Sequence, residues 1–180
     1  FRQSSMNDAS LLYDGGMTAV RGDVNRIEEK LFKKTSVRIA NSNTPLQSVL
    51  TGLKIELPPV EEQFGRNGFK VTHLRVAGAY HHPTYMGLAA RVLDYILDLS
   101  DTEIKEPKIH LVLDTTGKTE KNPHKIRRAL VEQVISRTQW IEVINFFIKQ
   151  GIPRENIIEV GPGRVLTNML KDFPKLKTLG

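Results

Sequence analysis

A regular alternation of short strand and helix patterns over residues 15–76 constrains the fold of this chain more than any other feature. An apolar run at residues 17–20 lies between glycines and is typical of a strand. Asp23 can cap the helix that follows, in which Ile27 and Leu31 share one face. The first unit is therefore a strand followed by a helix.

The rest of this region repeats the pattern. Residues 36–40 alternate polar and apolar, residues 41–45 supply turn chemistry, and residues 47–51 read as a second strand, which together predict a hairpin. Two prolines open a short helix at residues 58–64, and residues 69–76 alternate as another strand. The resulting order, β-α-β-β-α-β, is that of a ferredoxin-like module.

After residue 76 the pattern changes to longer helices around single apolar strands. Two compact apolar runs, residues 109–113 and 156–160, have the continuous apolar character of buried parallel strands. Helical periodicity covers residues 86–97, 123–137, 140–150 and 165–173. This part of the sequence predicts one edge of an α/β domain.

Composition limits the partners and the chemistry. The formal net charge of +6 favours an acidic partner, and the absence of cysteine excludes disulfides and thiolate nucleophiles. No apolar stretch approaches the ~20 residues of a membrane span, so we expect no membrane insertion. The chain begins at Phe1 without a signal peptide, which suggests a fragment or a processed product.

Several motifs, in order along the chain, carry a family resemblance. Residues 159–167 read E-V-G-P-G-R-V-L-T, residues 76–83 read V-A-G-A-Y-H-H-P, residues 129–133 read A-L-V-E-Q, and residues 41–45 read N-S-N-T-P. These segments resemble E-V-G-P-G-K-V-L-T, V-S-G-A-F-H-S-P, A-L-V-R-Q and N-x-N-S-P of the malonyl-CoA:acyl-carrier-protein transacylases. R-Q-S-S-M at residues 2–6 is also similar to the family's R-G-x-x-M, so the resemblance spans nearly the whole chain.

The resemblance implies the C-terminal part of an α/β-hydrolase-like acyltransferase domain with an inserted ferredoxin-like subdomain. Residues 1–14 would end a helix of the large subdomain, residues 15–76 would form the small subdomain, and residues 77–180 would continue the large one. Family members carry a G-H-S-L-G nucleophile elbow before this region, and no serine of this chain lies in a G-x-S-x-G motif. The resemblance therefore implies a serine outside these residues.

Transfer of a malonyl group between thiols through an acyl-serine intermediate requires a neutral histidine as base. By resemblance this base is His81, although counting back from Met86 selects His82. The family places an asparagine where this chain has Asp114, whose carboxylate would hold the histidine but could also raise its pKa. The two histidines are adjacent and cannot both face one ion, so we expect no metal.

Other site residues also follow from the resemblance. Arg2 would pair with the malonyl carboxylate, because a guanidinium fork matches a carboxylate through two parallel hydrogen bonds. Met6 would line the acyl pocket, and Asn43 and Gln133 would shape the cleft. Malonyl-CoA would be the substrate, and no permanently bound cofactor is implied.

The acidic partner would be the acyl carrier protein, whose phosphopantetheine arm supplies the accepting thiol. A dense basic run containing Lys125, Arg127 and Arg128 predicts the surface that attracts this carrier. An ordinary solvated helix face is the competing interpretation of the same run.

Two other functions remain open at this level. The chain could be an inactive descendant that serves as a subunit of a large mitochondrial or ribonucleoprotein assembly, an alternative that the positive charge and Asp114 favour. An organellar matrix is then the expected location, with the bacterial cytoplasm as the alternative. A dedicated RNA-binding module is a weaker hypothesis, because residues 17–20 and 36–40 carry no aromatic side chain for base stacking.

Overall fold

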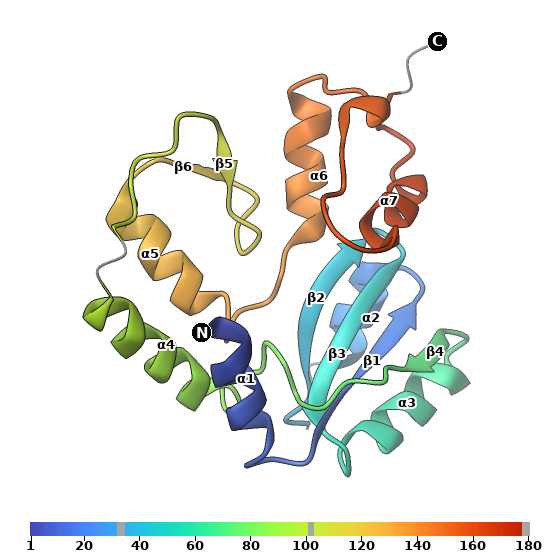
Figure 1. The fold of residues 1–180 in the computed structure, drawn as a ribbon. Helices are drawn as coiled ribbons and strands as arrows, with labels where there is room; N and C mark the ends of the chain where they lie inside the picture. The colour runs from blue at the N-terminus through green and yellow to red at the C-terminus, as the bar shows by residue number, and fades with distance from the viewer. Residues whose placement is uncertain (32–34, 101–102, 178–180) are drawn as a thin grey trace.

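A computed structural model describes residues 1–31, 35–100 and 103–177 of the chain (Figure 1). It has a four-stranded sheet with two helices, a group of helices that includes the N-terminal one, and a C-terminal segment that packs on α6. The helices are α1 (Arg2–Ser10), α2 (Val24–Leu31), α3 (Leu57–Arg66), α4 (Gly87–Leu99), α5 (Pro123–Glu132), α6 (Trp140–Lys149) and α7 (Val165–Met169). The strands are β1 (Gly15–Arg21), β2 (Arg38–Thr44), β3 (Gln47–Leu53), β4 (Lys70–His73), β5 (Leu111–Val112) and β6 (Thr119–Glu120), and short 3₁₀ helices cover Arg154–Asn156 and Leu170–Asp172.

The four-stranded sheet has the order β2-β3-β1-β4, and all its neighbouring strands are antiparallel. Its elements follow one another as β-α-β-β-α-β, which is the order that the sequence predicted. Val20 and Leu50 point to one face of the sheet, where they pack with Ile27 of α2 and Phe64 of α3. Both helices therefore cover the same face.

The opposite face of this sheet contributes to the candidate site. Because side chains alternate along a strand, Met17 and Val49 point away from the helices, and they form a second cluster with Ala40. Tyr80 packs against this cluster from the chain that follows β4. The sheet thus supports the turn that carries the two adjacent histidines.

Helices α1, α4 and α5 form a separate core. Met6 and Ala9 of α1 are buried against Ala90 and Leu93 of α4, and Val134, just beyond α5, joins the same cluster. Figure 1 shows α1, α4 and α5 grouped beside the sheet. This arrangement holds the start of the chain next to the segment that follows α5.

The two apolar runs expected to be buried parallel strands are not, and that prediction was wrong. Residues 109–113 contain only the two-residue β5, which pairs antiparallel with β6, and the side chain of Ile109 is 80% exposed. Residues 157–160 form no strand, with Ile158 81% and Val160 94% exposed. A buried parallel strand needs a parallel neighbour and helices on both faces, and no parallel neighbour for these segments is present in the described residues.

Two predicted helices are shorter than expected. The helix predicted for residues 123–137 ends at Glu132, because the backbone of Thr138 instead bonds to Ala40 and Ser42 of β2. The predicted helix of residues 165–173 divides into α7 and a 3₁₀ turn.

No helix within the described ranges is both long and apolar enough to cross a bilayer.

Candidate active site

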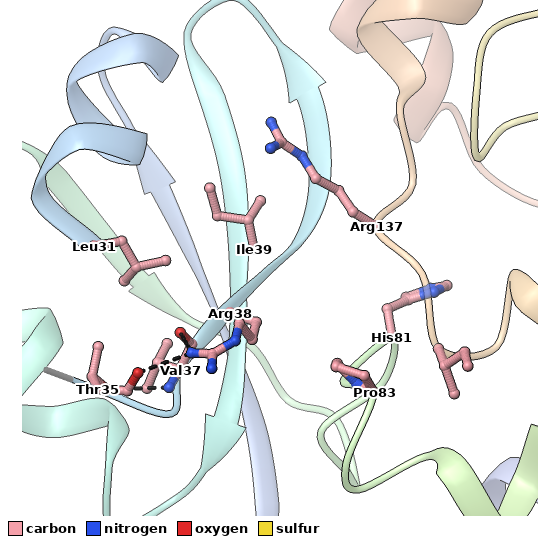
Figure 2. Close-up of a pocket in the computed structure, with 9 residues that line it drawn as sticks. Leu31, Thr35, Val37, Arg38, Ile39, His81, Pro83 and Arg137 are labelled. Atoms are coloured by element: carbon pink, nitrogen blue, oxygen red, sulfur yellow. Dashed lines mark hydrogen bonds between the residues drawn. The ribbon is translucent and has the colours of Figure 1, made fainter. Parts of the chain in front are cut away.

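His81 lies in a turn between β4 and α4 and has a left-handed backbone, with a φ of 63°. Few residues other than glycine adopt this conformation, and it persists only where surrounding packing fixes it. The neighbouring Ala79, His82 and Met86 are all buried, which supplies that packing. The turn directs the His81 ring toward the segment after α5 (Figure 2).

One hydrogen bond defines the tautomer of His81. Its Nδ1 lies 2.9 Å from the backbone carbonyl oxygen of Gln133. A carbonyl oxygen only accepts, so Nδ1 carries the proton, and the lone pair of the neutral ring is on Nε2. This is the tautomer that a proton-accepting histidine needs.

Burial lowers the pKa of His81 below its ordinary value, and the nearby charge of Arg2 lowers it further. The carbonyl of Gln133 and the carboxylate of Asp114 oppose this shift without reversing it. The ring is therefore neutral at neutral pH, as a general base must be.

Gln133 forms hydrogen bonds with three residues of the site: Arg2, His81 and Asp114. Its side-chain oxygen Oε1 accepts hydrogen bonds from Nε of Arg2, at 3.0 Å, and from Nη2 of the same residue. Its Nε2 donates to Oδ2 of Asp114 at 3.0 Å, while its backbone oxygen accepts from His81. Asp114 thus hydrogen-bonds to the side chain of Gln133, and its charge also acts on the pKa of His81.

Arg2, Met6 and His81 line one small pocket of about 210 Å³, together with Gln3, Met17, Asn41 and Tyr80. Met6 is 4% exposed and forms an apolar wall. The pocket therefore combines a guanidinium, a thioether and a base, which suits a short acyl group that ends in a carboxylate.

His82 has a different environment. Its Nε2 donates to the backbone oxygen of Ser36 at 2.9 Å, and its Nδ1 accepts from the backbone N–H of Thr84 at 3.2 Å. The ring is 2% exposed and stacks on Tyr85, with ring centroids 4.2 Å apart. Both nitrogens of His82 are occupied in the core, so the geometry favours His81 of the two candidates.

Asn43 lines neither of the pockets that contain His81. Its side-chain amide donates to Oε1 of Gln47 at 3.2 Å, across the β2–β3 hairpin. Asn41, two residues earlier, lines the Arg2 pocket and forms a bridge with Thr138. Asn41, the first asparagine of the N-x-N pair and not one of the residues predicted from the resemblance, therefore lies at the candidate site.

The basic run on α5 is partly neutralised. Arg127 pairs with Asp94 at 2.7 Å and Asp98 at 2.6 Å, which ties α5 to α4. Arg128 pairs with Glu132 at 2.6 Å within α5. Lys125 is exposed at the start of α5.

Sequence comparison finds relatives along most of the chain, although no family model matches it. Malonyl CoA-acyl carrier protein transacylase of Bacillus subtilis is 31% identical over 185 residues, which cover 99% of this chain and 57% of the relative. Polyketide biosynthesis protein ThaF of Burkholderia thailandensis is 33% identical over 162 residues, or 88% of this chain and 14% of that protein.

Solved structures agree. The malonyl-CoA:acyl carrier protein transacylase of Xanthomonas oryzae superposes with a TM-score of 0.86 and 30% identity, over 98% of this chain and 56% of that one. This chain is homologous to one part of the malonyl-CoA:acyl carrier protein transacylases. A further transacylase, solved in complex with its type II polyketide acyl carrier protein, has a TM-score of 0.84 at 27% identity, over 98% of this chain and 57% of that one.

The similarity to transacylases supports the fold of this chain more directly than its activity. The mixed α/β structure matches the transacylase fold over nearly all its residues, but the chain spans only about half the length of the transacylases it matches. The relatives named here are bacterial proteins. They give no support to a mitochondrial location or to membership of a ribonucleoprotein assembly.

Proposed function

We propose that this chain contributes the histidine base and the carboxylate-binding arginine to malonyl transfer from coenzyme A to an acyl carrier protein, in fatty acid or polyketide synthesis. The observation that carries the proposal is the bonding of Gln133, which holds Arg2 by its side chain and His81 by its backbone. A carboxylate-binding group and a base are thus fixed relative to each other.

In the proposed reaction, Nε2 of His81 accepts the proton of a serine hydroxyl as the serine oxygen attacks the thioester carbonyl. The serine belongs to a segment outside these 180 residues. The carbon–sulfur bond then breaks, and the imidazolium returns its proton to the departing coenzyme A thiolate. The same steps in reverse transfer the malonyl group to the phosphopantetheine thiol of the carrier, with no permanently bound cofactor.

Arg2 supplies selectivity in this scheme. Its Nε and Nη2 already donate to Gln133, which holds the guanidinium plane in place, and the remaining donors are available for the malonyl carboxylate. An acetyl group has no carboxylate and gains nothing from this contact. The site should therefore prefer malonyl over acetyl thioesters.

The same proposal includes the domain organisation and the partner. Residues 15–76 would be the inserted ferredoxin-like subdomain, and residues 1–14 and 77–180 would belong to the large subdomain. The acyl carrier protein would approach Lys125. The inactive-subunit alternative rested on the positive charge and on Asp114 impairing the histidine. The hydrogen bond from Gln133 to Asp114 and the lowered pKa of His81 argue against that impairment.

The preference for malonyl tests this proposal. In the complete polypeptide, Arg2→Gln should lower the ratio of acylation rates with malonyl-CoA and acetyl-CoA about tenfold or more, because one charge-assisted pair is lost. Arg91→Gln, at an exposed position on α4, is the matched control and should keep the wild-type ratio. An unchanged ratio in Arg2→Gln would remove Arg2 from malonyl recognition.

A further inference from the structure

The turn that carries His81 is attached to two different parts of the fold. In Figure 1 the chain between β4 and α4 leads from the four-stranded sheet to the group of α1, α4 and α5. His81 bonds to the backbone of Gln133, on the side of these helices. The neighbouring His82 bonds toward the sheet, because its Nε2 donates to the backbone oxygen of Ser36, just before β2, at 2.9 Å. The two adjacent histidines therefore hold one turn between the helices and the sheet.

Ser36 is itself held by Glu56, which directly precedes α3. Oε1 of Glu56 accepts a hydrogen bond from the hydroxyl of Ser36, and Oε2 accepts from the backbone N–H of Leu53 at 3.1 Å. The hydroxyl of Tyr85 also donates to Oε2, at 3.4 Å. These contacts, the one with Ser36 most of all, lower the pKa of Glu56, so its carboxylate stays charged and accepts all three bonds. His82 is thus connected through Ser36 to the start of α3.

Both ring nitrogens of His82 are bonded within the protein, so this ring takes no part in proton transfer to a substrate. Its Nδ1 accepts from the backbone N–H of Thr84 at 3.2 Å, which leaves the proton of the neutral ring on Nε2, facing the oxygen of Ser36. The ring stacks on Tyr85 and is 2% exposed. A buried and fully bonded side chain of this kind fixes the backbone that carries it.

The backbone of His81 explains why the turn needs such a bond. Its φ of 63° lies in the left-handed region, which a residue with a Cβ keeps only where its surroundings fix it. A displacement of about 1 Å in a reacting group can cost about 100-fold in rate. A bond that fixes the next residue therefore bears directly on the position of the base.

We propose that His82 is a positioning residue for malonyl transfer: its bond to Ser36 holds the turn to the sheet and so keeps His81 in place beside the Arg2 pocket. The inference rests on the proposed function, because it takes His81 as the base. The transacylase motif V-S-G-A-F-H-S-P has serine where this chain has His82, and a serine hydroxyl is too short to reach Ser36 from the same backbone position. The bond is therefore a property of this chain's own sequence.

Two substitutions of His82 separate this bond from the packing of the ring. In His82→Gln the amide nitrogen can take the place of Nε2 and still donate to Ser36. In His82→Asn the shorter amide can take the place of Nδ1 and accept from Thr84, but it has no donor that reaches Ser36. Both variants lose the stack on Tyr85, so each is the matched control of the other. In the complete polypeptide, kcat and KM for acylation by malonyl-CoA are measured separately, and urea denaturation gives the stability of each variant.

His82→Asn should lower kcat about tenfold or more and leave KM within about twofold, because the base moves while the binding groups stay in place. The ratio of malonyl to acetyl acylation should also be kept, since Gln133 still holds Arg2. His82→Gln should restore kcat to within about threefold of the wild type, through the retained bond to Ser36. Ser36→Ala keeps the histidine ring but loses the bond to Glu56, and it should lower kcat severalfold at unchanged KM even if a His82 variant does not fold.

Equal losses of kcat in the two His82 variants, in step with their losses of stability, would reduce His82 to a packing residue and overturn the inference. Wild-type kcat in His82→Asn, or in Ser36→Ala where that variant alone can be measured, would overturn it as well. Each of these results leaves the proposed function intact. If the wild-type protein is not acylated by malonyl-CoA, the proposed function fails instead.

Discussion

Backbone conformation, burial and a hydrogen bond together set the orientation and the neutral state of the His81 ring. Its left-handed turn brings Nδ1 to the carbonyl of Gln133, and burial then keeps the ring uncharged. The adjacent His82 has the same chemistry but donates and accepts within the core. From the sequence, the motif favoured His81 but the spacing to Met86 selected His82. The different surroundings of the two adjacent rings arise only when the turn folds.

The lowered pKa of His81 predicts the pH dependence of acylation. Only the neutral ring can accept a proton, and a pKa below the ordinary 6.5 keeps the ring neutral as the pH falls through that value. We expect kcat/KM for malonyl-CoA to fall to half of its plateau value at a pH below the ordinary ~6.5. An inflection above 6.5 would show that Asp114 dominates instead.

At the scale of elements, the sequence predicted the order of the sheet region correctly, but residues 41–44, predicted as part of a turn, belong to β2. The later strands were predicted poorly. Strands β1 to β4 and helices α2 and α3 follow from periodicity, because they bury their apolar faces against one another within the chain. The runs at 109–113 and 156–160 have the composition of buried strands, but in the described residues neither run has a parallel strand beside it. Likewise, the bonding of Gln133 to Arg2 joins positions 131 residues apart, which no local pattern reveals.

The contact between β1 and the histidine turn predicts the effect of a single methyl group. A Cβ on Gly15 would lie 2.4 Å from the backbone nitrogen of Ala79, so Gly15→Ala must displace the turn that carries His81. We expect a loss of about 1–3 kcal/mol in the free energy of unfolding, measured by urea denaturation, and a slower acylation rate. Gly65→Ala, within α3 and with no atom within 4 Å of the added carbon, should instead gain about 0.5–1 kcal/mol.

Helix α5 carries two arginines that form ion pairs, Arg127 and Arg128, and the exposed Lys125. Lys125→Glu should raise the KM for the carrier protein severalfold, with an effect that shrinks as salt is added, because the attraction is between exposed charges. Lys149→Glu, on the exposed end of α6, makes the same change in net charge and serves as the control. Equal effects of both substitutions would mean that overall charge, rather than the α5 surface, attracts the carrier.

At the scale of the whole molecule, the chain exposes large apolar side chains of a kind that folded domains usually bury. Ile158 is 81% and Val160 94% exposed in a segment with the composition of a buried strand. The chain also covers 57% of the Bacillus subtilis transacylase. We therefore expect these side chains to be buried in the complete polypeptide.

A substitution at Ile158 tests that expectation. Ile158→Asp in the complete polypeptide should lower the free energy of unfolding by about 3 kcal/mol or more, because a charge would be buried without a partner. Ile55→Asp, at an equally exposed position (82%) in the turn before α3, should change it by less than about 0.5 kcal/mol. If Ile158→Asp is equally neutral, the segment lies on the true surface of the protein.

The central claim is that His81 activates a nucleophile for malonyl transfer, and the attachment of malonyl to the complete polypeptide measures it most directly. Intact-mass analysis after mixing with malonyl-CoA should show one malonyl group per chain, formed at least about 100-fold more slowly in His81→Asn, which tolerates the left-handed turn. His124→Asn, an exposed histidine on α5, should match the wild type. Well-folded wild-type protein that acquires no malonyl group, or His81→Asn acylated at the wild-type rate, would contradict the account.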